Sequence, residues 1–282
     1  MARIKKERKQ KKSASKIRRI IEGVVLVVAV CVFVYAAINL FAIWRANTQE
    51  EVVIERVREE MKAPTTEEKL DSWAPDFAKL QETNPDVVGW IVVLDTDISY
   101  PVVKGSDNEY YLNHLWDKKS NYAGAIFMDY RHQGDLSNLN TFIYGHNVHH
   151  GTMFAELENY MKESFFNEHP YVYYYTPAGN YKLQVFSAYV DKGDAPSYQN
   201  GIHISDASSY QNYIDYIKSL SRYDSGVELT TNDHMITLYT CSYENGVNPG
   251  NTEAEYIDDR YYIHCKVIEA LSGEMPFDNT ND

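Results

Sequence analysis

The stretch "MITLYTCSYEN", residues 235–245, is the most informative part of this 282-residue sequence. It begins with the alternation of a β-strand and continues, after its cysteine, with polar residues typical of a loop. Side chains alternate across a strand, so Ile236 and Leu238 share one face, while Tyr239 and Cys241 share the other. Since the aliphatic face is the natural core side, we expect Cys241 on the more polar face, at the end of a strand.

A second cysteine-bearing strand, "RYYIHCKV" at residues 260–267, has the opposite arrangement. Cys265 shares a face with Val267, which predicts that its thiol lies in the core, whereas Arg260 lies on the polar face. A disulfide between Cys241 and Cys265 is the structural alternative. The opposite facing of the two cysteines argues against it.

Short strand-like runs separated by turn signals occupy much of the chain on either side of the first stretch. Such a pattern predicts a closed or nearly closed β structure. The expected strands lie at residues 89–105 (two strands around an Asp-Thr-Asp turn), 123–131, 141–147, 171–177, 181–191, 234–241 and 260–271. Helical patterns precede the first strand, within residues 72–90, and interrupt the series at residues 151–169 and 206–224.

The charges divide the chain into a basic beginning and an acidic remainder. Residues 1–22 hold ten of the 27 Lys and Arg but only two of the 40 Asp and Glu, which leaves a net charge of −21 on the rest. A strongly acidic body repels phosphate, so this composition excludes nucleic acid as the partner. The asymmetry instead indicates two compartments.

Between these parts lies "GVVLVVAVCVFVYAAINLFAIW", residues 23–44, which is 22 residues long and uncharged. As a helix it would span roughly 33 Å, enough for a hydrocarbon core of about 30 Å. A cleaved signal peptide is the alternative, but its apolar core is usually about 7–15 residues long. The basic residues then place a tail at residues 1–22 in the cytoplasm and the acidic body outside the membrane.

Three residues at expected strand ends supply what thiol catalysis needs: a thiolate, a proton carrier and a group for the oxyanion. Cys241 is the candidate nucleophile. His146 ends the strand "TFIYGH" after a glycine, which permits a close backbone approach. Arg260 opens a strand on its polar face, whereas Arg131 sits in a charged turn and Arg222 follows an amphipathic helix.

Two other interpretations of His146 remain open. It can be a loop histidine without a catalytic role. Together with His149 and His150 it can also belong to a metal site, although no regular zinc spacing completes the set and adjacent histidines would diverge on a strand. We therefore expect no metal.

These residues resemble the sortases, membrane-anchored cysteine transpeptidases of Gram-positive bacteria. "TLYTC" is similar to the cysteine signature of that family, "IYGHN" to its histidine strand and "DDRYYIHCKV" to its arginine strand. The order His, Cys, Arg agrees as well. The resemblance is strongest to class B sortases, on "NPDVVGWI", "YPVVKGSDNEYYL", "GAIFMDYR", "GTMFAELENY" and a long helix before the cysteine strand.

The resemblance implies a mainly β fold, a closed eight-stranded barrel with N-terminal helices, over a catalytic domain at residues 76–272. Residues 45–75 would form a juxtamembrane helix or spacer, and residues 273–282 a flexible tail. No cofactor is implied. The catalytic domain would lie outside the cell, held by the single membrane span.

The resemblance also implies a two-step acyl transfer. Cys241 attacks the carbonyl after Thr in a C-terminal sorting signal of a surface protein, and an amine of a peptidoglycan precursor or a pilin then resolves the thioacyl enzyme. His146 is the implied acid and base, and Arg260 the implied oxyanion or positioning group. The expected groove residues are Tyr239, Thr240, Asn147 and Glu244. Tyr239 departs from the family, since class B members often have serine there.

Two rival functions remain. A cell-wall cysteine hydrolase would use similar groups with water as the acceptor, but papain-like hydrolases place the cysteine before the histidine, the reverse of this chain. A membrane-anchored adhesin or receptor domain would leave Cys241 inert.

Overall fold

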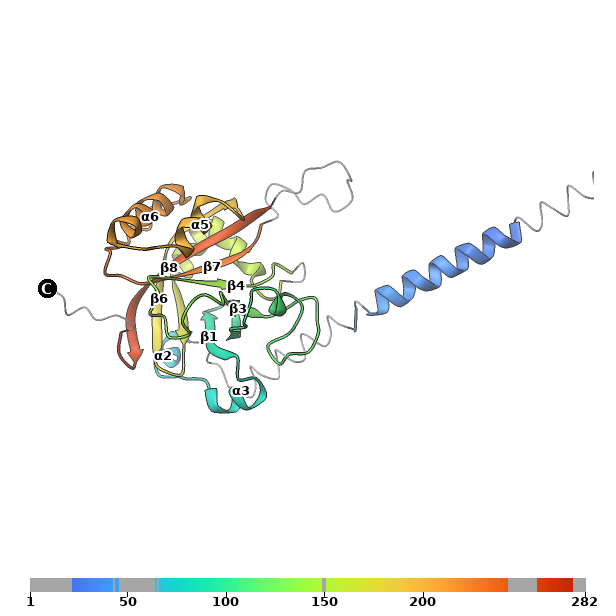
Figure 1. Ribbon diagram of the computed structural model, residues 1–282, viewed down its shortest axis with the longest axis horizontal. Helices are drawn as coiled ribbons and strands as arrows, with labels where there is room; N and C mark the ends of the chain where they lie inside the picture. Colours follow the sequence, from blue (N-terminus) through green and yellow to red (C-terminus); the bar gives the residue numbers. More distant parts are fainter. Residues whose placement is uncertain are drawn as a thin grey trace, which may run out of the picture. The chain divides into compact units, whose positions relative to one another are not determined.

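The structure is a computed structural model, and it describes residues 22–42, 44–45, 64, 66–148, 151–242 and 258–275. The chain forms two compact units. One holds the helix Glu22–Ala42, drawn in blue in Figure 1, which is long and apolar enough to cross a membrane. This helix corresponds to the span expected at residues 23–44. The expected juxtamembrane helix falls mainly on residues 46–63, outside the described part of the chain.

The second unit is a closed β-barrel (Figure 1), and its strand order is β1-β2-β3-β4-β7-β8-β6-β5. This confirms the expected eight-stranded barrel. The strands are β1 Val87–Val93, β2 Ser99–Val103, β3 Ile126–Met128, β4 Asn140–Tyr144, β5 Tyr171–Tyr175, β6 Asn180–Lys192, β7 Met235–Cys241 and β8 Asp259–Ser272. Each of the eight falls within or overlaps one of the strands that the alternating pattern predicts.

Helices precede the first strand and connect several of the others. They are α2 Glu67–Leu70, α3 Phe77–Thr83, η1 Tyr110–Leu112, η2 Ala155–Met161, α4 Glu163–Glu168, α5 Pro196–Ile202 and α6 Ala207–Leu220. The long helix expected before the cysteine strand is α6, and the Asp206 carboxylate starts it by accepting from the Ser209 amide. The single helix expected at residues 151–169 is instead a 3₁₀ helix followed by α4, because the chain becomes extended at Lys162.

The pairing of β4, β7 and β8 positions the candidate site. β4 runs parallel to β7, with Tyr144 beside Tyr239. β7 runs antiparallel to β8, with Cys241 directly opposite Arg260. The C-terminal ends of β4 and β7 and the N-terminal end of β8 therefore meet at one end of the barrel.

The alternating pattern correctly predicts a buried apolar face on β7 and β8, but it does not predict that part of their polar face is buried as well. Ile236, Leu238 and Cys265 are buried in the apolar core. The opposite face is polar, as expected, but Thr237 and His264 on it are also fully buried. The helices of the β6–β7 connection explain this burial, since the α6 residue Tyr213 packs against the His264 ring.

A hydrogen-bonded network satisfies this buried polar face. The Thr237 hydroxyl donates to Asn140 Oδ1 at 2.7 Å and therefore accepts from His264 Nδ1 at 2.9 Å. His264 Nε2 then accepts from the Tyr189 hydroxyl at 2.9 Å. Burial lowers the pKa of His264 to about 3, so its ring is neutral at physiological pH.

Prediction: stability falls as the pH drops below about 6.5, the pKa of an unfolded histidine. Burial lowers the pKa of His132 to about 4 and also lowers that of His234, so three folded histidines resist protonation. The unfolded chain binds those protons more readily, which removes up to about 1.4 kcal/mol per pH unit per histidine. Urea unfolding of the protein in detergent between pH 7 and pH 4.5 measures this slope.

The matched variants for this prediction are His264→Gln and His114→Gln. His264→Gln should flatten the dependence of unfolding free energy on pH, because a neutral amide replaces the buried imidazole. His114 is only partly buried, whereas His264 is fully buried, so replacing His114 should change the slope much less. An unchanged slope in His264→Gln would show that the buried ring is not the source of the acid sensitivity.

Candidate active site

The three candidate catalytic residues line one cavity of about 370 Å³ at the end of the barrel where β4, β7 and β8 meet. The strand pairing brings them together although Arg260 and His146 are far apart in sequence. The lining residues are Asn108, Leu112, Phe127, Tyr144, Gly145, His146, Tyr198, Tyr239, Thr240, Cys241 and Arg260.

Cys241 is the last residue of β7, and its thiol is free and partly exposed. Its backbone carbonyl accepts a hydrogen bond from Asn147 Nδ2 at 3.0 Å. Asn147 directly follows His146, so this bond ties the histidine segment to the cysteine strand. Cys265, whose thiol the sequence places in the core, is also free and is fully buried, and burial raises the pKa of its thiol.

His146 follows β4 and is half-buried. Its Nε2 lies 2.9 Å from the carbonyl oxygen of Leu112. A carbonyl can only accept, so Nε2 carries a proton, and in the neutral ring Nδ1 is the free base. The preceding Gly145 is required by packing, because a Cβ there would overlap Ile126 and Phe154. This is the close approach that the sequence predicts.

Arg260 is held from three directions. Its Nη1 donates to the Asp259 carbonyl at 3.0 Å, and its Nη2 pairs with the Asp258 carboxylate. The guanidinium carbon lies 5.8 Å from the centre of the Tyr239 ring. With only 18% of its side chain exposed, the guanidinium is largely fixed before any substrate binds.

The four expected groove residues have different outcomes. Tyr239 and Thr240 line the cavity, although the side chain of Thr240 is almost fully buried. Asn147 is buried and is not among the lining residues, and its side chain donates to the Cys241 carbonyl. Glu244 lies outside the described residues.

The structure adds cavity residues that the sequence analysis missed. Asn108, Tyr144 and Tyr198 come from three separate segments, and each is connected to Asp129 or Arg131 by hydrogen bonds. Asn108, Asp129, Arg131 and Tyr144 lie within stretches that resemble class B sortases, but the sequence assigned these residues no role and did not pair them. Arg131 forms a two-pronged ion pair with Asp129, at 2.7 and 2.8 Å.

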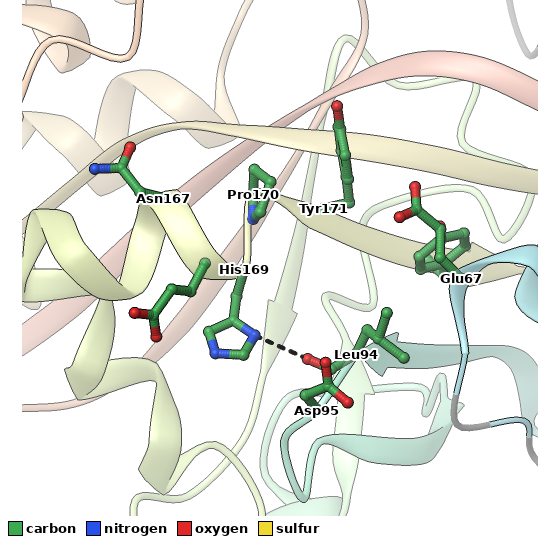
Figure 2. Close-up of a pocket in the computed structure, with 9 residues that line it drawn as sticks. Glu67, Leu94, Asp95, Asn167, His169, Pro170 and Tyr171 are labelled. Atoms are coloured by element: carbon green, nitrogen blue, oxygen red, sulfur yellow. Dashed lines mark hydrogen bonds between the residues drawn. The ribbon is translucent and has the colours of Figure 1, made fainter.

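A second cavity, of about 220 Å³, lies between the β1–β2 turn and the start of β5 (Figure 2). Glu67, Asp95 and His169 line it, and His169 Nδ1 donates to the Leu94 carbonyl at 3.0 Å. None of the candidate catalytic residues lines this second cavity. We therefore take the first cavity as the candidate active site.

The metal interpretation gains no support from the part of the chain that the structure describes. Within those residues, no group of three or more His, Cys, Asp and Glu side chains could hold a metal ion. His149 and His150 lie outside the described residues. The chemistry open to the cavity is that of a thiol, an imidazole and a guanidinium.

A closed barrel with these three groups at one end is the architecture of a cysteine acyl-transfer enzyme. Comparison with known proteins agrees with that class. The family model for the sortase domain matches residues 91–267. Sortase B of Listeria monocytogenes is 34% identical over 193 residues, which cover 68% of this chain and 74% of the relative.

Two further comparisons extend over more of the chain. Sortase B of Staphylococcus aureus is 33% identical over 218 residues, covering 77% of this chain and 87% of the relative. The structure of a Staphylococcus aureus sortase B–substrate complex matches with a TM-score of 0.67 and 32% identity, covering 79% of this chain and 98% of the other. The chain therefore belongs to the sortase family, class B, and is a cysteine transpeptidase of the cell envelope.

Prediction: Cys241 and Cys265 differ sharply in reactivity. A thiol-alkylating reagent should label Cys241 in the native protein but Cys265 only after unfolding, because one thiol lines a cavity and the other is buried. Peptide mapping by mass spectrometry distinguishes them from Cys31. Cys241→Ala should abolish thioacyl formation, while Cys265→Ser should retain it at a stability cost of about 1–3 kcal/mol. Native labelling of Cys265 before Cys241 would contradict this assignment.

Proposed function

We propose that this sortase cleaves a C-terminal sorting signal after Thr and transfers the resulting acyl group to an amine. The observation that carries the proposal is the pairing of Cys241 with Arg260 across adjacent strands, in the cavity that His146 also lines. The Staphylococcus aureus relative has been solved with a substrate, and a sortase B has been solved with triglycine, a peptide whose N-terminus is an amine. Those structures support a peptide donor and an amine acceptor here.

In the first step, the Cys241 thiolate, whose proton is held at Nδ1 of His146, attacks the carbonyl carbon of that Thr, and the carbonyl oxygen becomes negative. The C–N bond then breaks, and the leaving nitrogen takes a proton from His146. Nε2 of His146 donates its hydrogen to the Leu112 carbonyl, so Nδ1 is the atom that exchanges the proton with the substrate. The product is a thioester on Cys241 and a released C-terminal peptide.

In the second step, an amine attacks the thioester carbonyl while His146 removes its proton at Nδ1. A new amide bond forms and the Cys241 thiolate leaves, which restores the enzyme. In both steps Arg260 stabilises the negative carbonyl oxygen or holds the substrate carbonyl in place. Its contacts with Asp259 and Tyr239 fix it in advance, so little reorganisation is needed during the reaction.

The proposal is tested by incubating the enzyme with a library of sorting-signal peptides and candidate amines, followed by mass analysis. Amide products with the added amine support transfer. Products that contain only a new carboxylate would instead identify the cysteine hydrolase. If no product forms and His146→Ala leaves thiol labelling of Cys241 unchanged, these results would support the adhesin interpretation.

The partners follow from the same proposal. The donor would be a surface protein with a sorting signal, and the acceptor an amine of a peptidoglycan precursor or of a pilin. The helix Glu22–Ala42 would anchor the enzyme with its N-terminus in the cytoplasm and residues 76–272 outside. Tethering the enzyme at the membrane surface raises its effective concentration toward substrates tethered there.

Prediction: Arg260→Lys should remain folded but lose roughly a hundredfold or more in kcat/KM, mostly in kcat. Lysine keeps the charge but lacks the rigid fork of donors, and losing one oxyanion donor typically costs about 3 kcal/mol. Steady-state cleavage and transfer of a sorting peptide measure the effect, and thermal melts check the fold. Arg222→Lys, after α6, is the control and should behave as wild type. A folded Arg260→Lys enzyme with normal kcat would remove Arg260 from the oxyanion role.

Prediction: protease added to intact cells should digest the acidic body and spare the basic tail at residues 1–22. The excess of basic residues on one side of the span sets this orientation. Antibodies against tags at the two ends of the chain report which part survives. A protected body with a digested tail would reverse the proposed topology.

A further inference from the structure

Asp129 is a fully buried carboxylate next to the active-site cavity, and the reaction steps above do not use it. It directly follows β3 and accepts five hydrogen bonds, which come from the Tyr144 hydroxyl (2.6 Å), Asn108 Nδ2 (2.8 Å) and three nitrogens of Arg131 (2.7, 2.8 and 2.9 Å). Burial alone would raise the pKa of Asp129, but the bonds from Arg131 and Tyr144 outweigh it and hold the pKa below its ordinary value. The carboxylate is therefore ionised at physiological pH.

The partners of this carboxylate form one wall of the cavity. Asn108 and Tyr144 bond Asp129 directly and line the same cavity as Cys241. Tyr198 lines it too, and its hydroxyl oxygen accepts from Arg131 Nη2 at 2.9 Å. Three wall side chains from distant segments are thus positioned through one ion pair.

The donors and acceptors fix each of these wall groups in one orientation. Tyr144 donates its only hydroxyl hydrogen to Asp129. Tyr198 accepts from Arg131, so its own hydrogen is left for Tyr144, whose oxygen is 3.3 Å away, or for a ligand. The Asn108 amide cannot turn over, because its Oδ1 accepts from the Tyr130 backbone amide at 3.0 Å.

We propose that the Asp129–Arg131 ion pair is a positioning unit that holds Asn108, Tyr144 and Tyr198 in the geometry that binds the peptide substrate. This inference rests on the proposed function, in which the cavity is the peptide groove. Side chains that are already ordered cost little to immobilise when a ligand binds, so the pair lowers KM without touching the reacting atoms. Neither Asp129 nor Arg131 is among the residues that line the cavity.

The chain offers a matched control in the ion pair between Asp233 and Lys266. Its atoms are 3.0 Å apart and its side chains are 18% and 20% exposed, so it too is a partly buried pair on the barrel. Lys266 lies opposite Met235, at the far end of β7 from Cys241, and neither member lines the cavity. Asp233→Asn therefore reports the general effect of breaking an ion pair in this barrel.

The test uses the full chain in detergent with a sorting peptide selected from the library. Asp129→Asn and Arg131→Lys should raise KM for the peptide roughly tenfold or more, through the added cost of ordering three side chains. Their kcat and the rate of Cys241 alkylation should stay within about twofold of wild type. Asp233→Asn should lower the melting temperature and leave KM unchanged.

A double-mutant cycle gives a second measurement that does not depend on Asp129→Asn folding. Arg131 is one-third exposed, so Arg131→Lys is expected to fold, and Tyr198→Phe removes only the hydroxyl it contacts. The two changes should act on KM non-additively if Arg131 works through Tyr198. Additive effects on KM would contradict that route.

Three results would overturn the inference. If both Asp129→Asn and Arg131→Lys had the wild-type KM, the positioning role would be wrong and the proposed function would still stand. If Asp233→Asn raised KM equally, the effect of the Asp129 and Arg131 variants would be explained by a general loss of stability and not by positioning of the cavity wall. A wild-type enzyme that cleaves no sorting peptide would remove the proposed function and this inference together.

Discussion

The pairing of β7 with β4 on one side and β8 on the other is the constraint on which the rest of the structure depends. It places Tyr239 beside Tyr144 and Cys241 opposite Arg260. A slip of one residue would exchange the two faces of β7 and send its cysteine toward the core. Parallel neighbours also require a long crossover, and here residues 145–234 supply it, carrying β5, β6, α5 and α6. The active site can therefore form only when most of the barrel has closed.

Both faces of β7 and β8 protect that register. The inner face is apolar, and Ile236 and Leu238 bury nearly all of their surface there. The outer face is a network of buried hydrogen bonds in which Thr237 and His264 each have a single workable donor and acceptor arrangement. An apolar face alone tolerates small shifts, whereas a buried polar group left without a partner costs free energy. The network thus specifies one alignment of the strands that carry the cysteine and the arginine.

The sequence predicted what depends on local alternation and missed what depends on long-range hydrogen bonds. Eight strands, the buried Cys265 and the packing reason for Gly145 follow from short patterns, and the structure has all three. The Asp129 cluster could not be found in this way, because its hydrogen-bonded partners lie as far as 67 residues apart and no local pattern pairs them. The burial of Thr237 was missed for a related reason, since the helices that cover it belong to another part of the chain.

Tyr239 lies between Arg260 and the cavity wall that includes Tyr144 and Tyr198. On one side its ring lies 5.8 Å from the Arg260 guanidinium, and on the other its centre lies 5.4 Å from that of Tyr144 and 5.7 Å from that of Tyr198. Its hydroxyl donates to the Gly193 carbonyl at 3.1 Å, which fixes the orientation of the ring. A serine, as class B members often have there, could make neither the ring contacts nor the cation–π contact. The departure at this one position therefore couples the placement of the arginine to the shape of the cavity.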